Sequence, residues 1–376
     1  MKLALYIHVP FCLEKCPYCD FHSIAVDRPA VPQQTYADCV LRQLEREVGR
    51  LQLQGRSLVS CFFGGGTPSL MDQEFFDRVL NCLPKYFSVD AACEITVETN
   101  PATADCEKFK QWLPAGINRI SFGMQSFHPH LLQRLGRFHT AKEGFAAMSK
   151  AREAGFTNIN TDIIFGIEGQ TLQELESDLV TAMNLQPTHI SAYQLTVEAG
   201  TPLANWVQSG KIVLPPEENI IAMHHLTAKL LEAGGFRRYE ISNYAQPNFE
   251  ARHNLQYWEC GDSLGIGSGA VSFVAGKRWR TTRKLKNYLA GDFIPDEEET
   301  LSLKTAMGEY CMMGLRLMCG IDRNDFANRF GQSMEAVWPG LFARLQSKGW
   351  LQNREDRVAL TPEGLMFANI VAIEFL

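Results

Sequence analysis

The chain has 376 residues, of which 45% are hydrophobic and 21% are charged, and its formal net charge is -6 at pH 7. This length is ample for a large α/β domain with a smaller appendage, and the composition is that of a soluble globular protein. The acidic balance excludes an electrostatic footprint for nucleic acid, so we expect no nucleic-acid partner. No apolar run approaches a membrane span and the first residues lack a secretory pattern, so we expect a cytoplasmic protein.

The chain begins with a short apolar run, residues 3–11, that predicts a buried strand. Three cysteines with the spacing CxxxCxxC follow on the loop at the end of this strand: Cys12, Cys16 and Cys19. Three thiolates on so short a loop can ligate three corners of an iron–sulfur cube and leave the fourth iron open to a small molecule. The alternatives are a zinc site with His8 or His22 as fourth ligand, and three unrelated thiols.

Helix-like and strand-like segments alternate after this loop. The predicted helices are residues 36–53, 72–82, 105–115, 141–155, 172–185 and 217–233. The predicted strands are residues 57–63, 94–98, 119–122, 158–165, 189–197 and 238–243. Strands separated by helices of this length indicate parallel βαβ units with right-handed crossovers. Six or seven such units fit an open (β/α) barrel better than a flat doubly wound sheet, but these patterns leave that choice open.

The predicted strands end in glycine, proline or polar residues, as in the GGGTPS motif at residues 64–69. In a (β/α) barrel the loops at the carboxyl ends of the strands converge, so we expect a site there. The GGGTPS backbone could approach a ligand closely, or it could form a tight turn in which Thr67 or Ser69 caps the next helix. It lacks the lysine of a P-loop, so a nucleotide phosphate site is not expected.

The regular alternation stops beyond residue 245. Residues 246–300 are expected to be a connecting segment, with an HNxxYW motif at residues 253–258 and an acidic stretch at 296–300 that suggests a solvated domain boundary. Residues 301–376 are expected to form a mostly helical domain whose helix, hairpin and helix pattern resembles a winged helix. Because this domain has no basic patch, we expect a packing or partner role there and not DNA binding. The expected first domain is residues 1–245.

CxxxCxxC after the first strand and GGGTPS after the second together resemble the radical S-adenosylmethionine (SAM) superfamily. The strand ends GGGTPS, ETNP and GMQS are similar to those of the branch that contains oxygen-independent coproporphyrinogen III oxidase. Within that branch the motifs CPYCDF and HNxxYW make the chain most similar to the heme chaperones, over nearly its whole length. The resemblance implies a partial (β/α) radical SAM barrel with a mostly helical, winged-helix-like C-terminal domain.

The resemblance also implies site residues. Cys12, Cys16 and Cys19 would bind a [4Fe-4S] cluster. The residues assigned to SAM and the rest of its pocket are Tyr6, Tyr18, Gly65, Gly66, Thr67, Glu98, Gln125, Arg137 and Asp162. Without the resemblance, Arg137 and Asp162 read as surface ion-pairing residues and Glu98 as a helix cap.

His253 of the HNxxYW motif would be an axial ligand of heme, with Tyr257 and Trp258 supplying flat faces for the macrocycle. The residues alone favour a different interpretation, in which the histidine caps a turn and the two aromatic side chains are buried between domains. The match to the family motif reverses that preference.

The implied function is that of a chaperone that binds heme, a [4Fe-4S] cluster and SAM and delivers heme to hemoproteins such as respiratory enzymes. Acceptors at the membrane surface and a homodimer are among the expected partners. The implied cluster chemistry is one-electron reduction of SAM to methionine and a 5′-deoxyadenosyl radical.

The alternative function is oxygen-independent coproporphyrinogen III oxidase. That oxidase has a further cysteine where this chain has Phe21, and it has a long N-terminal arm where this chain has eleven residues before Cys12. Both differences favour the chaperone. A zinc-stabilised interaction protein is the third hypothesis, from a different functional class.

Overall fold

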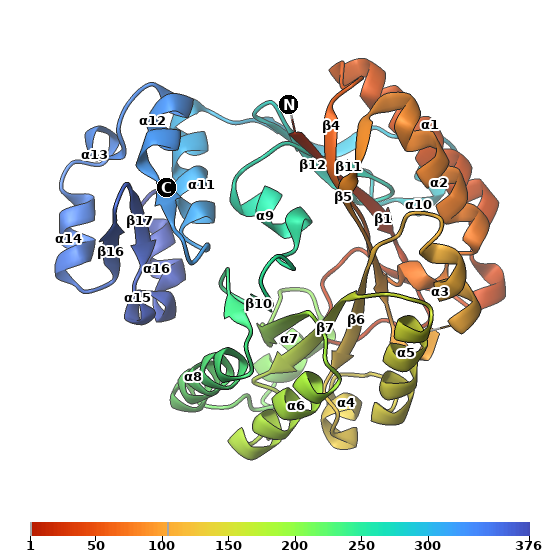
Figure 1. Ribbon diagram of the computed structural model, residues 1–376, viewed down its shortest axis with the longest axis horizontal. Coiled ribbons are helices and arrows are strands. Elements are labelled where there is room, and N and C mark those ends of the chain that lie inside the picture. The colour runs from red at the N-terminus through yellow and green to blue at the C-terminus, as the bar shows by residue number, and fades with distance from the viewer. Residues whose placement is uncertain (1, 104) are drawn as a thin grey trace.

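The computed structural model describes residues 2–103 and 105–376 (Figure 1). A 12-stranded sheet forms the main body, and a smaller unit of helices with a three-stranded sheet lies beside it. The strand order of the main sheet is β14-β13-β12-β11-β1-β4-β5-β6-β7-β8-β10-β9. Its central strands, β11-β1-β4-β5-β6-β7-β8, are all parallel to their neighbours.

The strands of the main sheet are β1 (Lys2–Val9), β4 (Ser57–Gly65), β5 (Ser88–Thr99), β6 (Arg119–Gln125), β7 (Asn158–Phe165), β8 (His189–Gln194), β9 (Arg237–Arg238), β10 (Asn243–Ala245), β11 (Ser263–Ile266), β12 (Val271–Val274), β13 (Lys277–Thr281) and β14 (Pro295–Thr300). The helices of this body are α1 (Gln33–Leu51), α2 (Gln73–Tyr86), α3 (Cys106–Trp112), α4 (Pro129–Arg134), α5 (Ala141–Glu153), α6 (Leu172–Asn184), α7 (Pro202–Gln208), α8 (Glu217–Ala233), α9 (Arg252–Trp258) and α10 (Leu285–Leu289). Within the described residues, none of the chain's helices has both the length and the apolar character required to traverse a bilayer.

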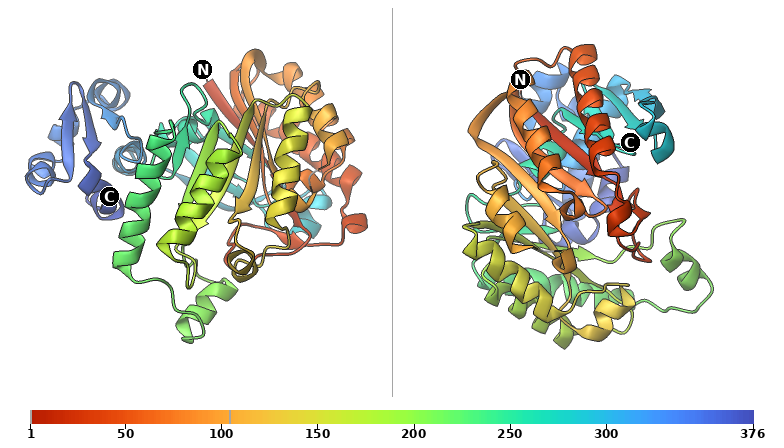
Figure 2. Two further views of the ribbon diagram at one scale, coloured as in Figure 1. Left: turned by 60° about the horizontal axis from the view of Figure 1, so that its bottom comes forward. Right: turned by 90° about the vertical axis from the view of Figure 1, so that its right-hand side faces the viewer.

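The parallel strands are joined by helices that cover the outer side of the sheet, whereas α9 lies on its inner side (Figures 1 and 2). Local sequence explains where several of these helices begin. Thr140 and Glu143 form a reciprocal capping box at the start of α5, and Thr171 and Glu174 form another at the start of α6. This architecture confirms the prediction of a partial (β/α) barrel, and it brings the carboxyl ends of the strands to one edge.

The segment at residues 246–300 differs from its expected form as a connection. It supplies α9 and the strands β11 to β14, and β11 pairs in parallel with β1 at the centre of the sheet. These strands were missed because they have only four to six residues and the sequence has no clear period there.

The acidic stretch within this segment forms the exposed edge strand β14, which directly precedes α11 (Leu303–Gly314). The carboxylates of Glu297 and Glu299 lie 3.0 and 2.6 Å from the guanidinium groups of Arg280 and Arg278 on the neighbouring strand β13. Cross-strand ion pairs of this kind favour one register, so opposite charges help to place β14 on β13.

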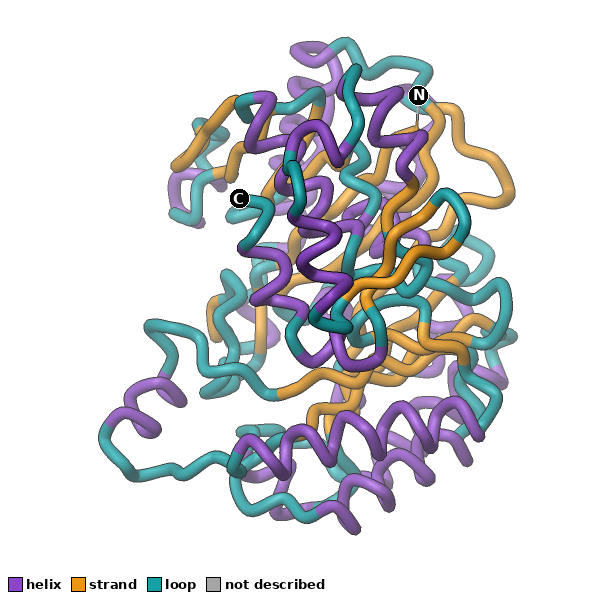
Figure 3. The backbone as a smooth tube through the Cα atoms, turned by 90° about the vertical axis from the view of Figure 1, so that its left-hand side faces the viewer, coloured by secondary structure: helices purple, strands orange, loops and turns teal. Residues whose placement is uncertain are grey.

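The C-terminal unit has its own hydrophobic core. Its elements are α11 (Leu303–Gly314), β15 (Ile321–Asp322), α12 (Arg323–Phe330), α13 (Met334–Val337), α14 (Leu341–Ser347), β16 (Leu351–Arg354), β17 (Arg357–Leu360), α15 (Pro362–Met366) and α16 (Ala368–Ile373). The hairpin β16–β17 follows α14 and precedes α15, as the winged-helix-like pattern predicted. Figure 3 shows this unit from the side, with the C-terminus on it.

Phe375 is central to the core of the C-terminal unit. Its side chain is fully buried, and its ring centroid lies 5.2 Å from that of Trp338 and 5.5 Å from that of Phe342. Phe375→Ala is therefore expected to lower the free energy of unfolding of this unit by about 3–5 kcal/mol, because it removes a buried ring and leaves a cavity.

The matched control is Ile373→Ala, because Ile373 ends α16 and is 68% exposed. We expect the control to change the free energy of unfolding by no more than about 0.5 kcal/mol. Urea denaturation followed by tryptophan fluorescence measures both variants, and equal losses would contradict the central position of Phe375.

Candidate functional site

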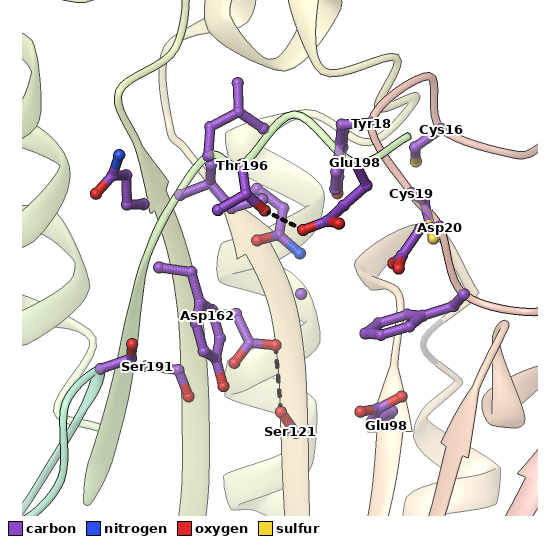
Figure 4. Close-up of a pocket in the computed structure, with 18 of the residues that line it drawn as sticks. Cys16, Tyr18, Cys19, Asp20, Glu98, Ser121, Asp162, Ser191, Thr196 and Glu198 are labelled. Carbon is purple, nitrogen blue, oxygen red and sulfur yellow. Dashed lines mark hydrogen bonds between the residues drawn. The ribbon is translucent and has the colours of Figure 1, made fainter. Parts of the chain in front are cut away.

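A cavity of about 1260 Å³ lies on the inner side of the main sheet. Its walls come from the cysteine loop, from residues of β4 to β8, from α8 and from α15 and α16 of the C-terminal unit. Figure 4 shows Cys16 and Cys19 on the loop, with Glu98 and Asp162 on strands below them. Pockets for one small molecule measure roughly 300–1,000 Å³, so this cavity has room for more than one ligand.

The cysteine loop is held at both ends by backbone hydrogen bonds. The short strands β2 (Phe11–Cys12) and β3 (Ile24–Ala25) pair in parallel, and the Val26 amide donates to the Cys12 carbonyl at 2.8 Å. Cys12, Cys16 and Cys19 are free thiols that line the cavity. Within residues 2–103 and 105–376, no three His, Cys, Asp or Glu side chains are gathered closely enough to hold a single metal ion.

The GGGTPS loop packs directly against the cysteine loop. The amides of Gly66 and Thr67 donate to the carbonyls of Val9 and Phe11 at 2.8 and 2.7 Å. A Cβ atom on Gly66 would lie 2.6 Å from the Phe11 carbonyl oxygen and 3.0 Å from the Cys12 sulfur, so only glycine fits there. The Thr67 hydroxyl, 3.6 Å from the same sulfur, is aimed at the thiol instead of capping a helix.

Two buried carboxyl groups face the cavity from the strands. Glu98 accepts a hydrogen bond from the Gly65 amide at 3.1 Å, and Asp162 accepts from Asn160 at 2.7 Å and from Ser121 at 3.3 Å. Burial, with a further contribution from the nearby Asp162, raises the pKa of Glu98 to about 8. Burial also raises the pKa of Asp162. A cationic ligand in this cavity would favour the ionised form of both groups.

Gln125 and Arg137 present polar atoms without a partner among the described residues. Gln125 adopts a φ of +66°, and its Oε1 atom is buried and accepts no hydrogen bond. Arg137 donates to the Gly123 carbonyl at 2.7 Å and lies 3.7 Å from the Cys16 sulfur, but its Nε atom is buried and unpaired. Buried polar groups are normally paired, so these atoms indicate a polar ligand.

The fit of these residues to an iron–sulfur cluster and SAM follows from their chemistry. Three free thiols, a bare glycine loop, two carboxyl groups and two unpaired polar side chains surround one cavity. SAM carries an amino group, a carboxylate and a cationic sulfonium, which match this set of donors and acceptors.

Most of the residues expected at the site do line the cavity, and these are Cys12, Cys16, Tyr18, Cys19, Gly65, Gly66, Thr67, Glu98, Gln125, Arg137 and Asp162. Tyr6 is not among the lining residues. Its hydroxyl donates to Nδ1 of His8 at 3.1 Å, and Nε2 of that histidine donates to the His22 carbonyl at 2.7 Å. Tyr6 therefore lies beneath the site and supports it from β1.

His253 is buried and is not among the residues that line the cavity. It is 2% exposed, with Nδ1 2.9 Å from the Ser60 hydroxyl and Nε2 2.9 Å from the Tyr257 hydroxyl. Its ring centroid lies 4.9 Å from that of Phe62 on β4. An axial ligand must offer a ring nitrogen to iron, and both nitrogens are already hydrogen-bonded inside the protein. His253 as an axial ligand of heme therefore stays a prediction, and Asn254 is the residue of the motif that lines the cavity.

Several cavity residues were not anticipated from the sequence, namely Ser121, Asn160, His189, Ser191, His224, Arg238 and Arg316. The strand NINTDIIF carries a signal for Asn160, because it lies two residues before Asp162 and so shares the inner face with it. Asn160 also accepts a 2.6 Å hydrogen bond from Nδ1 of His189 on β8, which extends this polar face to the next strand.

Comparison with known proteins agrees with this geometry. Residues 6–181 match the family model of the radical SAM superfamily, and residues 301–367 match that of the HemN C-terminal domain. Among solved structures, coproporphyrinogen III oxidase HemN of Escherichia coli superposes with a TM-score of 0.82, covering 99% of this chain and 89% of that one. At 22% identity, that likeness shows a shared fold alone.

Curated relatives are similar over the full length. The heme chaperone HemW of Haemophilus influenzae is 37% identical, with 100% of this chain and 98% of that protein aligned. The heme chaperone HemW of Bacillus subtilis is 35% identical, with 100% of this chain and 99% of that protein aligned. The chain therefore belongs to the HemW family within the radical SAM superfamily.

Proposed function

We propose that this protein is a heme chaperone that carries a [4Fe-4S] cluster and SAM and delivers heme to hemoproteins. The observation that supports the proposal most is a single cavity with two kinds of wall. Thiols, glycines and buried carboxyl groups line one part, and exposed apolar side chains of α8 and α16 line another. Respiratory acceptors at the membrane surface and a homodimer stay predictions from the family resemblance.

In this proposal Cys12, Cys16 and Cys19 hold the cluster, and the GGGTPS backbone, Glu98 and Arg137 hold SAM. When bound, the cluster and SAM together supply one-electron chemistry. The protein's own residues tune and orient these groups. The Arg137 guanidinium beside the Cys16 sulfur and the Thr67 hydroxyl beside the Cys12 sulfur would stabilise the thiolate forms that bind iron.

The apolar wall fits a flat macrocycle. Ile221 of α8, Phe367 and Ile370 of α16 line the cavity although each is at least one-third exposed. Exposed apolar side chains gathered around a hollow are typical of a binding site for an apolar ligand. A wall that stays open to solvent suits a ligand that must be released again to an acceptor.

The proposal is tested by anaerobic reconstitution followed by three measurements: iron and labile sulfide content, heme uptake by absorbance, and conversion of coproporphyrinogen III. We expect an iron–sulfur cluster, heme uptake and transfer to an apo-hemoprotein, and no protoporphyrinogen. Cys16→Ser should lose the cluster, whereas the control Cys106→Ser, on α3 and outside the cavity, should keep it. Zinc without sulfide, or robust protoporphyrinogen formation, would overturn the proposal.

Glu98 links the site to the pH dependence of stability. Its pKa is about 8 in the folded chain against an ordinary value of 4.5. As pH rises above 4.5 the unfolded chain releases this proton and the folded chain keeps it, so burial of the group destabilises the fold increasingly up to about pH 8. The loss is on the order of a few kcal/mol and does not grow above that pH.

Glu98→Gln should therefore be more stable than the wild type without SAM, with a difference that grows from pH 5 to pH 8. The same variant should bind SAM more weakly, because it lacks the anionic acceptor. Denaturant unfolding at several pH values measures the first effect and calorimetric titration the second. The exposed control Glu176→Gln should match the wild type in both, and a parallel pH profile for Glu98→Gln would contradict the burial of this charge.

His253 offers a direct test of its structural role. His253→Ala leaves the Ser60 and Tyr257 hydroxyl groups without their partner, so the free energy of unfolding should fall by about 1–3 kcal/mol. The Soret band of bound heme should keep its position, because the ring does not reach the cavity. The control is His225→Ala, an exposed histidine of α8. A shifted Soret band in His253→Ala alone would support this residue as the iron ligand.

A further inference from the structure

Two arginines without an ion pair lie on the wall of the cavity between the barrel and the C-terminal unit. Arg238 belongs to β9, and Arg316 follows α11. Within the described part of the chain, neither has a carboxylate oxygen at ion-pair distance, since their side-chain hydrogen bonds go to the Ile241 carbonyl and to the Asn369 amide oxygen. Arginines in a cavity with unused charge are candidates for anion binding.

The fold brings these two residues together through an antiparallel contact between distant segments. Glu240 and Leu317 form an isolated β-bridge, and the Met318 amide donates to the Tyr239 carbonyl at 3.0 Å. This register places Arg316 opposite Ile241, the residue whose carbonyl accepts from Arg238. Both arginines thus belong to adjacent segments, and both line the cavity.

Each guanidinium group keeps donors free. The Nε atom of Arg238 is buried and donates to no described residue, and the group lies 5.6 Å from the ring centroid of Tyr244. Arg316 makes one bond, at 3.2 Å to Asn369, and lies 5.6 Å from the ring centroid of Trp258. A guanidinium group has five N–H donors, and stacking on an aromatic ring fixes the plane in which they point.

The charge at this place is positive. Glu240 is the buried carboxyl group near both arginines, and its oxygens accept from the Ser242 amide at 3.0 Å and from the Asn243 side chain. Burial raises the pKa of Glu240, and this single carboxyl group lies near two guanidinium groups. An entering carboxylate would therefore meet two cations with free donors.

The apolar part of the same cavity indicates which kind of anionic ligand could bind there. Ile221 approaches from α8, and Met366 and Ile370 approach from the C-terminal unit. A ligand that uses both features has a flat apolar body with carboxylate arms, which is the chemistry of heme. Resting on the function proposed above, we propose that Arg238 and Arg316 bind the propionate carboxylates of heme and so fix its orientation in this cavity.

The test compares two ligands on the reconstituted protein: heme, and heme dimethyl ester in which both carboxylates are blocked. The double variant Arg238→Gln/Arg316→Gln should bind heme at least about 10-fold more weakly than the wild type, because charge-assisted hydrogen bonds are lost. The ester should bind the wild type and the double variant equally. Arg237→Gln is the matched control, because Arg237 is the exposed neighbour on β9 and does not line the cavity.

SAM also carries a carboxylate, so a parallel SAM titration separates the two ligands. Unchanged SAM affinity and an unchanged melting temperature in the single variants Arg238→Gln and Arg316→Gln, with weakened heme binding, support the assignment. Arg316→Lys should bind heme more tightly than Arg316→Gln, since lysine keeps the positive charge but lacks the planar guanidinium group.

Two outcomes overturn the assignment. If the wild type binds heme and the double variant binds it equally well, the arginines do not hold the propionates and the chaperone function stands. If heme and its ester lose the same affinity in the double variant, the arginines act only through the fold. A wild type that takes up no heme overturns both the assignment and the proposed function.

Discussion

The site depends on how closely two backbone segments approach each other. Gly66 passes so near the Phe11 carbonyl and the Cys12 sulfur that no side chain fits between them. Hydrogen bonds from Gly66 and Thr67 to the end of β1 and to β2 hold that distance. Since the glycine loop follows β4 and the cysteine loop follows β1, the parallel pairing of these two strands sets the geometry of the cofactor end of the cavity.

Much of the barrel could be predicted because local pattern and tertiary structure agree. The strand β7 and the helix α8 have the predicted bounds, since an apolar run and an amphipathic run are each flanked by turn residues. The strands β11 to β14 could not be found in this way. They are short, and four of the six residues of β14 are acidic, so their pairing depends on partners such as β13 that the local sequence does not reveal.

Some residues of the site could likewise be predicted from local sequence, and others could not. The cysteines, Glu98 and Gln125 were assigned through the family resemblance, because they lie in motifs that can be read along the chain. The burial of His253 could not be predicted from the sequence, because it depends on contacts with Ser60 and Phe62, which lie on a strand nearly 200 residues away in sequence. Arg238 and Arg316 could not be predicted as a pair for a similar reason. The β-bridge between Glu240 and Leu317 joins segments that no sequence periodicity relates.

The walls of the cavity rest on two separate hydrophobic cores: the strands and α8 on that of the barrel, and α15 and α16 on that of the C-terminal unit. Loosening the core around Phe375 would displace the α15–α16 wall, while the thiol loop rests on the core of the barrel. Substitutions that accumulate in one core therefore have little effect on the packing of the other. The apolar wall of α15 and α16 can therefore change in shape over evolution without disturbing the thiol loop at the other end of the cavity.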